Sequence, residues 1–115
     1  MSMDTRDITS TAEALARLPL PAIGELSDQQ VRGITCVWDR RHPLTAGTAV
    51  DLGPRTMNRL GEKRQWYPRG CRSCTGDAAY RLLLDHSPAC DQCIKDGGGC
   101  ELGRALVRLV RDGRR

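Results

Sequence analysis

The sequence predicts a small α+β domain that is held together by metal ions rather than by a large hydrophobic core. Five of its six cysteines lie within residues 71–100, and four of these form two CxxC pairs that are separated by a helix-like segment. The 115 residues include no Phe, two Trp and two Tyr, but twelve Gly and six Pro. A single small domain with so few large apolar side chains usually needs disulfides or metals to be stable.

The second CxxC pair has a complete set of metal ligands close to it in the sequence. Cys90 and Cys93 are preceded by His86 and followed by Cys100, in the order H-x3-C-x2-C-x6-C. Three thiolates and one imidazole are a common tetrahedral set for structural zinc. The spacing therefore predicts a Cys3His zinc site, with His86 brought to it by the end of the preceding helix.

The first pair, Cys71 and Cys74, needs partners from upstream, where Cys36 is the only other cysteine. Asp39 stands three residues after Cys36, the position of the second cysteine in a CxxC knuckle. His42 is the better zinc ligand by type, but it requires a wider loop. A proline follows His42 and favours an extended conformation there, so spacing favours Asp39 and ligand chemistry favours His42. The two sites together predict two Zn2+ per chain.

The cysteines are predicted to be ligands rather than disulfides. The N-terminal segment has no apolar core behind a basic start, so we expect no signal peptide, and no run approaches the roughly 20 apolar residues of a membrane span. We therefore expect a cytoplasmic protein that does not enter membranes. In that reducing compartment, CxxC pairs are more often metal ligands than structural disulfides.

Two parts are expected along the chain, an N-terminal helical arm and a di-zinc domain with two zinc units. Their predicted ranges are 1–33 for the arm, 34–115 for the domain, and 34–85 and 86–115 for its units. In the arm, Ser10 with Glu13 and Ser27 with Gln30 have the spacing of capping boxes. The first box predicts a helix over about 11–18, and the second a shorter helix further on.

The first zinc unit is predicted to be treble-clef-like, with a ligand knuckle, a β-hairpin and a CxxC that opens a helix. Stretches with strand propensity occur at 34–38, 48–52 and 64–67, and the helix follows over about 75–85. A helix start offers free N–H groups and a positive dipole end to thiolates. After the second zinc knuckle and a glycine turn, a C-terminal helix is predicted, with an apolar face made of Leu102, Ala105, Leu106, Leu109 and Val110.

Several short runs within residues 34–115 resemble small cysteine-rich proteins of high-GC actinobacteria, most of which have no assigned activity. These runs are C-V-W-D, T-A-V-D-L-G, W-Y-P-R-G-C-R-S-C, C-D-Q-C and G-R-A-L-V-R-L-V-R. Such proteins look like treble-clef or zinc-ribbon units, and some have cysteine where Asp39 stands. The resemblance implies zinc binding, a bacterial cytoplasmic setting and a ligand role for Asp39, and it implies no established activity.

The charge pattern favours contact with nucleic acid. The formal net charge is +4, and six basic residues face only Glu62 between residues 55 and 72, close to Trp66 and Tyr67. Basic groups interleaved with aromatic rings suit phosphate contact and base stacking. Three more arginines recur at helical spacing on the last helix. The candidate nucleic-acid-binding residues are Arg55, Arg59, Lys63, Arg64, Arg69, Arg72, Arg104, Arg108 and Arg111.

The sequence contains no recognisable catalytic motif. No H-x-E occurs, as a zinc deaminase requires, and there is no P-loop or dinucleotide-binding glycine motif. We therefore predict a non-enzymatic, regulatory di-zinc module that contacts nucleic acid and has no small-molecule substrate. The alternative is a protein–protein adapter on the same scaffold, because residues 1–35 hold five acidic and three basic residues and adjoin a basic body.

Overall fold

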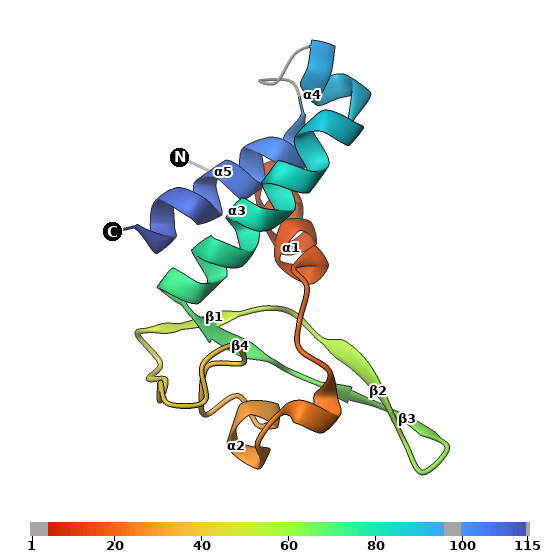
Figure 1. Ribbon diagram of the computed structural model, residues 1–115, viewed down its shortest axis with the longest axis vertical. Helices are drawn as coiled ribbons and strands as arrows, with labels where there is room; N and C mark the ends of the chain where they lie inside the picture. The colour runs from red at the N-terminus through yellow and green to blue at the C-terminus, as the bar shows by residue number, and fades with distance from the viewer. Residues whose placement is uncertain (1–4, 96–99, 115) are drawn as a thin grey trace.

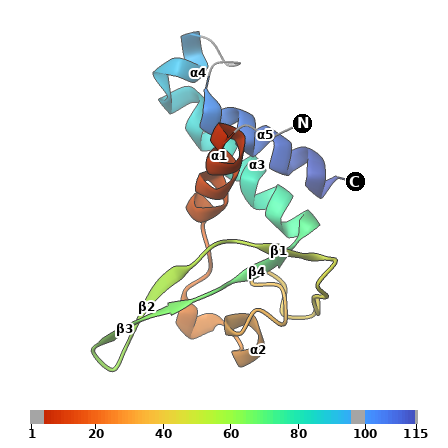
Figure 2. The same cartoon turned by 180° about the vertical axis from the view of Figure 1, so that it is seen from behind.

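The computed structural model of the protein describes residues 5–95 and 100–114, and it has the predicted α+β composition (Figure 1). The helices are α1 (Thr5–Arg17), the 3-10 helix η1 (Ile23–Glu25), α2 (Asp28–Val31), α3 (Arg72–Ala89), α4 (Asp91–Lys95) and α5 (Glu101–Gly113). The strands are β1 (Ala49–Asp51), β2 (Arg55–Arg59), β3 (Glu62–Trp66) and β4 (Arg69–Cys71). Helix α5 packs against α3 and α1 in one half of the molecule, and the strands and α2 form the other half (Figures 1 and 2).

The strands form two small antiparallel sheets, whose pairing differs from the prediction. β1 pairs with β4, so that Ala49 lies opposite Cys71, and β2 pairs with β3. The segment 34–38, which was expected to be a strand, is a loop with a single bridge between Thr35 and Pro43. The expected hairpin between 48–52 and 64–67 is replaced by pairing of each segment with a strand that the sequence pattern does not reveal.

The β2–β3 hairpin, residues 55–66, is called the ribbon below. Leu60 and Gly61 connect its strands with φ values of 54° and 81°. Positive φ at both central residues is the pattern of the two-residue turns that best match strand twist. In β3 the first four side chains are exposed and only Trp66 is buried. In β2, Arg55 and Met57 are half-buried, while Thr56 and Asn58 are exposed. Because an arginine takes the place of an apolar residue on the inward face, the strand shows no hydrophobic alternation, which explains why the sequence pattern misses β2.

Helix α1 begins at Thr5, several residues before the predicted start, so Ser10 lies within the helix rather than at its N-cap. Near its end, Ala14 and Leu18 are buried in the same core as Ala105 and Leu106 of α5. Packing of an amphipathic face stabilises most protein helices more than local propensity does. The N-terminal arm and the rest of the chain therefore share one core.

Arg55, at the base of the ribbon, closes the C-terminal end of α1. Its guanidinium Nη2 donates hydrogen bonds to the carbonyl oxygens of Leu15 and Leu18, at 2.9 and 3.2 Å. The last carbonyls of a helix have no partner within the helix, and a cation is favourable beside them. Burial lowers the pKa of Arg55. This arginine thus has a structural contact, and it does not lie on the free basic surface that the sequence predicted.

Helices α3 and α5 cross where two glycines meet. A Cβ on Gly113 would lie 2.8 Å from the Cα of Gly76 and 2.8 Å from the carbonyl oxygen of Arg72. Small residues at such a crossing let the two backbones approach closely, and Ala79 and Ala105 are fully buried nearby in the core. No helix within 5–95 and 100–114 has the length and apolar character needed to cross a membrane.

We expect Gly76→Ala to lower the free energy of unfolding by about 1–3 kcal/mol, as overpacking usually does. The new Cβ would lie 2.9 Å from the Gly113 Cα and 3.3 Å from the Leu109 carbonyl oxygen, although alanine is otherwise the better helix former. Urea unfolding of the metal-loaded protein measures the change. Gly24→Ala is the control, because nothing lies within 4 Å of its Cβ position. Equal midpoints for both variants would contradict the close helix crossing.

Candidate metal centres

Three sulfur atoms meet where the loop that carries Cys36 reaches the start of α3. The sulfurs of Cys36, Cys71 and Cys74 lie within 4.8 Å of one another. Cys71 is the N-cap of α3, and its sulfur accepts a hydrogen bond from the Cys74 N–H at 3.4 Å. The Cys71 N–H donates in turn to the Cys36 sulfur at 3.3 Å. Hydrogen bonds of this kind favour the thiolate form that binds metal ions.

Gln30 fixes the Cys36 loop, a role that its place in the sequence does not reveal. The predicted capping box forms, because Ser27 Oγ accepts from the Gln30 N–H and Gln30 Oε1 accepts from the Ser27 N–H. At its other end the same amide group, Nε2, donates to the carbonyls of Cys36 and Val37 at 3.1 Å each. The side chain is buried. One glutamine therefore joins the start of α2 to the backbone of a metal-ligand loop.

Neither candidate for the fourth ligand joins the first group. Asp39 and His42 are exposed, and neither belongs to the set of ligand atoms that lie within 4.8 Å of one another. The Asp39 Oδ1 accepts the Arg41 N–H at 3.0 Å. The carbonyl of His42 accepts the Cys36 N–H at 3.0 Å, which closes the loop. Among the described residues, the first group therefore offers three ligands, while a tetrahedral ion takes four.

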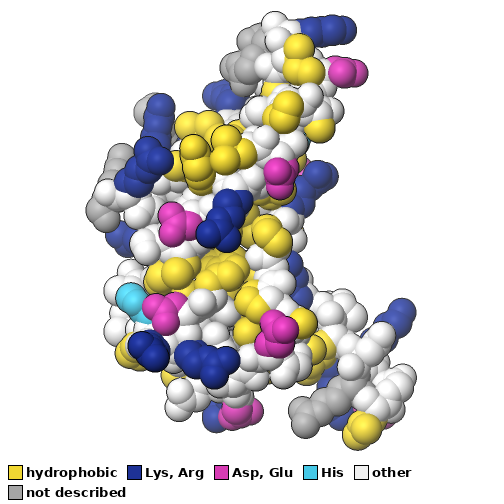
Figure 3. All heavy atoms as spheres, in the orientation of Figure 1, with side chains coloured by type: hydrophobic (Ala, Val, Ile, Leu, Met, Phe, Trp, Pro, Cys, Tyr) yellow, Lys and Arg dark blue, Asp and Glu magenta, His cyan; other side chains and the backbone are white. Residues whose placement is uncertain are grey.

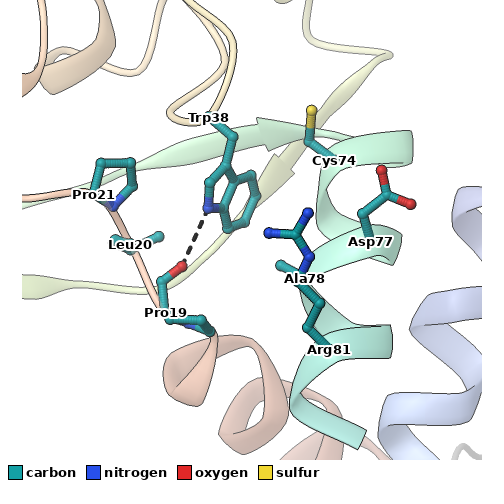
Figure 4. Close-up of a pocket in the computed structure, with 8 residues that line it drawn as sticks. All are labelled: Pro19, Leu20, Pro21, Trp38, Cys74, Asp77, Ala78 and Arg81. Atoms are coloured by element: carbon teal, nitrogen blue, oxygen red, sulfur yellow. Dashed lines mark hydrogen bonds between the residues drawn. The ribbon is translucent and has the colours of Figure 1, made fainter. Parts of the chain in front are cut away.

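A cavity of about 430 Å³ adjoins the first group (Figure 4). Trp38 forms one wall, and its indole Nε1–H donates to the Pro19 carbonyl at 3.1 Å. Arg81 of α3 points its guanidinium group towards the Trp38 ring, and the Cys74 sulfur lies at the far edge from the prolines (Figure 4). Cys36 and Cys71 are buried and Cys74 is half-buried. Cys74 is therefore the accessible edge of the first group.

The second group forms at the opposite end of α3, with the members that the spacing predicted. His86 lies in the last turn of α3, Cys90 follows that helix directly, Cys93 lies on α4 and Cys100 precedes α5. Their ligand atoms lie within 4.8 Å of one another, with 3.3 Å between His86 Nε2 and the Cys100 sulfur. Three sulfurs and a nitrogen complete a tetrahedral set. The predicted glycine turn at 97–99 lies outside the described residues.

Cys100 repeats at α5 the arrangement that Cys71 has at α3. It is the N-cap of α5, and its sulfur accepts the Gly103 N–H at 3.4 Å. Gly103 itself has no room for a larger residue without adjustment, because a Cβ there would lie 3.3 Å from the Cys93 sulfur. The glycine thus allows the first turn of α5 to approach the second group closely.

The cysteines of each group differ in proton affinity. Burial raises the pKa of Cys71, but hydrogen bonds, first that from the Cys74 backbone, outweigh burial and hold this pKa below its ordinary value. Burial and the neighbouring sulfurs raise the pKa of Cys74. In the second group, the Cys93 backbone lowers the pKa of Cys90, whereas burial and the hydrogen bond with Cys100 raise that of Cys93 to about 12. Several thiolates at such close range repel one another, and a metal cation removes that penalty.

Not all of the predicted basic residues are exposed. Arg104, Arg108 and Arg111 of α5 were all expected to face solvent. Arg108 is instead half-buried, and its Nη2 lies 3.5 Å from Thr11 Oγ1 of α1. The side chain of Arg59 lies outside the described residues. Basic side chains are spread along the length of the face in Figure 3. The exposed members of the predicted set are Lys63 and Arg64 on β3, Arg69 on β4, Arg72 on α3, and Arg104 and Arg111 on α5.

No protein-family model matches this chain, and no match was found among curated proteins or among solved structures. The case for the two metal centres therefore depends on their own geometry. Each group combines ligands from separate elements, and together they use all six cysteines.

We expect Cys90→Ser to lower the metal content from two ions per chain to one, and Asp39→Ala to leave it at two. The serine variant removes one member of a complete four-ligand set. Asp39 could supply only a weak oxygen ligand to the first site, and water or His42 could replace it. Metal analysis of protein purified under reducing conditions, combined with thermal unfolding, measures both effects. Equal or greater metal loss in Asp39→Ala would show that the first site depends on this carboxylate and that neither water nor His42 replaces it.

Proposed function

We propose that the protein is a non-enzymatic di-zinc module of a bacterial cytoplasm, which acts in regulation by contacting nucleic acid. The observation that carries the proposal is the presence of two cysteine-rich ligand groups at opposite ends of α3. They resemble the ligand sets of structural zinc sites, in which metal replaces a large core. A treble-clef-like arrangement of the first unit, with its CxxC at a helix start, belongs to the same proposal.

Zinc is the metal that suits these ligands best. Thiolate-rich tetrahedral sets select zinc or iron–sulfur clusters, and the Cys3His set of the second group is a common structural zinc site. At the first site, the proposed fourth ligand is Asp39, or His42, from the exposed loop that follows Cys36. All six cysteines are free, which is consistent with the proposed reducing compartment.

The nucleic-acid part of the proposal is supported by exposed arginines on α5. Arg104 and Arg111, with the half-buried Arg108, border a groove of about 380 Å³ between α5 and α3. Leu83 and Val107 also line this groove. Arg72 lies close to the far end of α5, because its carbonyl oxygen would be 2.8 Å from a Cβ on Gly113. A row of guanidinium groups beside an apolar surface suits a phosphate backbone.

Exposed apolar side chains favour a protein–protein adapter as the second candidate function. Leu84 and Ile94 are 56% and 65% exposed, and Tyr80 is 45% exposed. Apolar side chains gather on the helical half of the face in Figure 3. Exposed apolar patches of sufficient size mark protein interaction surfaces.

We expect a chelator to unfold the protein when it removes both metal ions. Structural zinc contributes on the order of 10 kcal/mol or more per site, and net stability is usually about 5–15 kcal/mol. Circular dichroism, recorded while zinc is released to a stronger chelator, measures the loss of helix. Re-addition of zinc under reducing conditions should restore the spectrum. A metal-free protein with an unchanged spectrum would contradict a structural role for the metal.

We expect binding to duplex DNA to weaken steeply with salt, and the double variant Arg104→Gln/Arg111→Gln to flatten the slope of log K against log salt by about two. Both side chains are exposed, so zinc content and melting temperature should not change. Fluorescence anisotropy at several salt concentrations gives the slope. The matched control is Arg17→Gln/Arg32→Gln, because these arginines already pair with Glu13 and Asp28. Absence of salt-sensitive binding to DNA or RNA would favour the adapter function.

A further inference from the structure

The ribbon projects from the sheet half of the molecule as a two-stranded arm (Figures 1 and 2). Its base is fixed to the body by buried Trp66 and by the two hydrogen bonds from Arg55 to the end of α1. Its outer part is free, because Glu62 and the three residues after it are all exposed. Met57, in the inner part of β2, packs against the core. The part of the ribbon beyond Met57, around the turn of Leu60 and Gly61, contributes little to folding, so its presence calls for another explanation.

Leu60, at the tip of the ribbon, is an unfavourable residue for its position. Its φ is 54°, in the left-handed region that glycine and asparagine tolerate and leucine disfavours. It is also 98% exposed, so the side chain gains nothing from packing within the chain. Two-residue turns of this kind strongly prefer Asn-Gly, and Gly61 already supplies the second residue. A sequence that keeps a residue against a local rule without a folding gain points to a function at that residue.

One face of the ribbon carries hydrogen-bonding side chains and a positive charge. Thr56 pairs with Gln65 and Asn58 with Lys63, and directly opposed residues share a face of the sheet. All four side chains are exposed. The acidic Glu62 is paired with Arg64 at 3.3 Å. Residues 55–66 contain four basic residues and one acidic residue, and of the basic residues Arg55 is engaged at the end of α1. The other three basic residues and Glu62 give the outer ribbon a formal charge of +2, which is complementary to a polyanion.

We propose that the ribbon enters the minor groove of duplex DNA and that Leu60 wedges between two base pairs and bends the duplex. This deepens the nucleic-acid contact proposed above and rests on it. Proteins that bind the minor groove read it with Lys, Arg, Asn and Gln and insert apolar side chains, leucine among them, between base steps. The backbones of two paired strands alone are about 4.8 Å apart, and with its side chains the ribbon is wider than the minor groove of straight DNA, which measures about 6 Å. The ribbon therefore needs a groove that is opened by a kink, which the wedge provides.

The test compares zinc-loaded wild type with Leu60→Asn on duplexes of about 30 base pairs that carry a donor and an acceptor dye at their ends. Flexible TA steps near the centre lower the cost of a kink. Wild type should raise energy transfer as it binds, because the ends approach one another. Leu60→Asn should bind on the order of tenfold more weakly than wild type, and its complex should show the same energy transfer as the free duplex. Its melting temperature should be equal to or higher than that of wild type, because asparagine suits the left-handed turn.

Two further variants show whether a loss of DNA bending is specific to Leu60 and whether Lys63 of the ribbon contacts a phosphate. Leu84→Asn is the matched control, since it removes another exposed leucine, on α3, and should bend DNA like wild type. Lys63→Gln should keep the bend and flatten the salt slope by about one. A lower melting temperature of Leu60→Asn, or a salt slope that Lys63→Gln does not alter, would overturn the ribbon proposal.

The failures of the two proposals are distinguishable. Duplex binding without a bend, or an unaltered bend with Leu60→Asn, overturns the ribbon proposal and leaves the nucleic-acid function standing. A clear preference for single-stranded DNA or RNA over duplex has the same consequence. Absence of salt-sensitive binding to all three probes overturns both proposals.

Discussion

The crowding of sulfur atoms at the two ends of α3 is the constraint on which the rest of the fold depends. Three cysteine sulfurs at one end, and three with the ring of His86 at the other, lie within 4.8 Å of their group members. Uncharged, these groups contribute little cohesion, and as thiolates they repel one another. A bound cation converts both situations into attraction. Because the apolar core is small, the proposed metal ions would supply much of the attraction that holds the helices and sheets together.

The same local device builds both groups. Cys71 and Cys100 each cap a helix, and each accepts an N–H from the residue three positions on. A helix start holds the N–H groups and the positive dipole end that stabilise a thiolate, so the ligand is oriented before any metal arrives. A metal ion bound at each site would join a helix start to another segment: for α3 the Cys36 loop, which is distant in sequence, and for α5 the nearby end of α3.

The sequence was sufficient for what depends on short-range spacing. The composition of the second group, the capping box of Ser27 and Gln30, and the apolar face of α5 are confirmed, because each is set by residues a few positions apart. The pairing of β1 with β4, by contrast, joins three-residue strands from distant parts of the chain, and no periodic signal specifies it. The contacts of Arg55 and of the Gln30 amide group could not be predicted from the sequence either, because they depend on which carbonyl groups the fold brings near these side chains.

The stability of the fold resides in the helices and their contacts, and the tip of the ribbon is not needed for it. The close glycine crossing and the core shared by α1, α3 and α5 fix the helices, so the chain can support an arm whose tip adds little to the core. Arg55 couples that arm to the body, because one guanidinium group both anchors β2 and closes α1. Force on the ribbon would therefore reach α1 and, through Ala14 and Leu18, the face of α5 that lies against it. In the proposed contact with duplex DNA, an arm whose base is fixed and whose tip is free can hold the DNA in a bent form without being displaced itself.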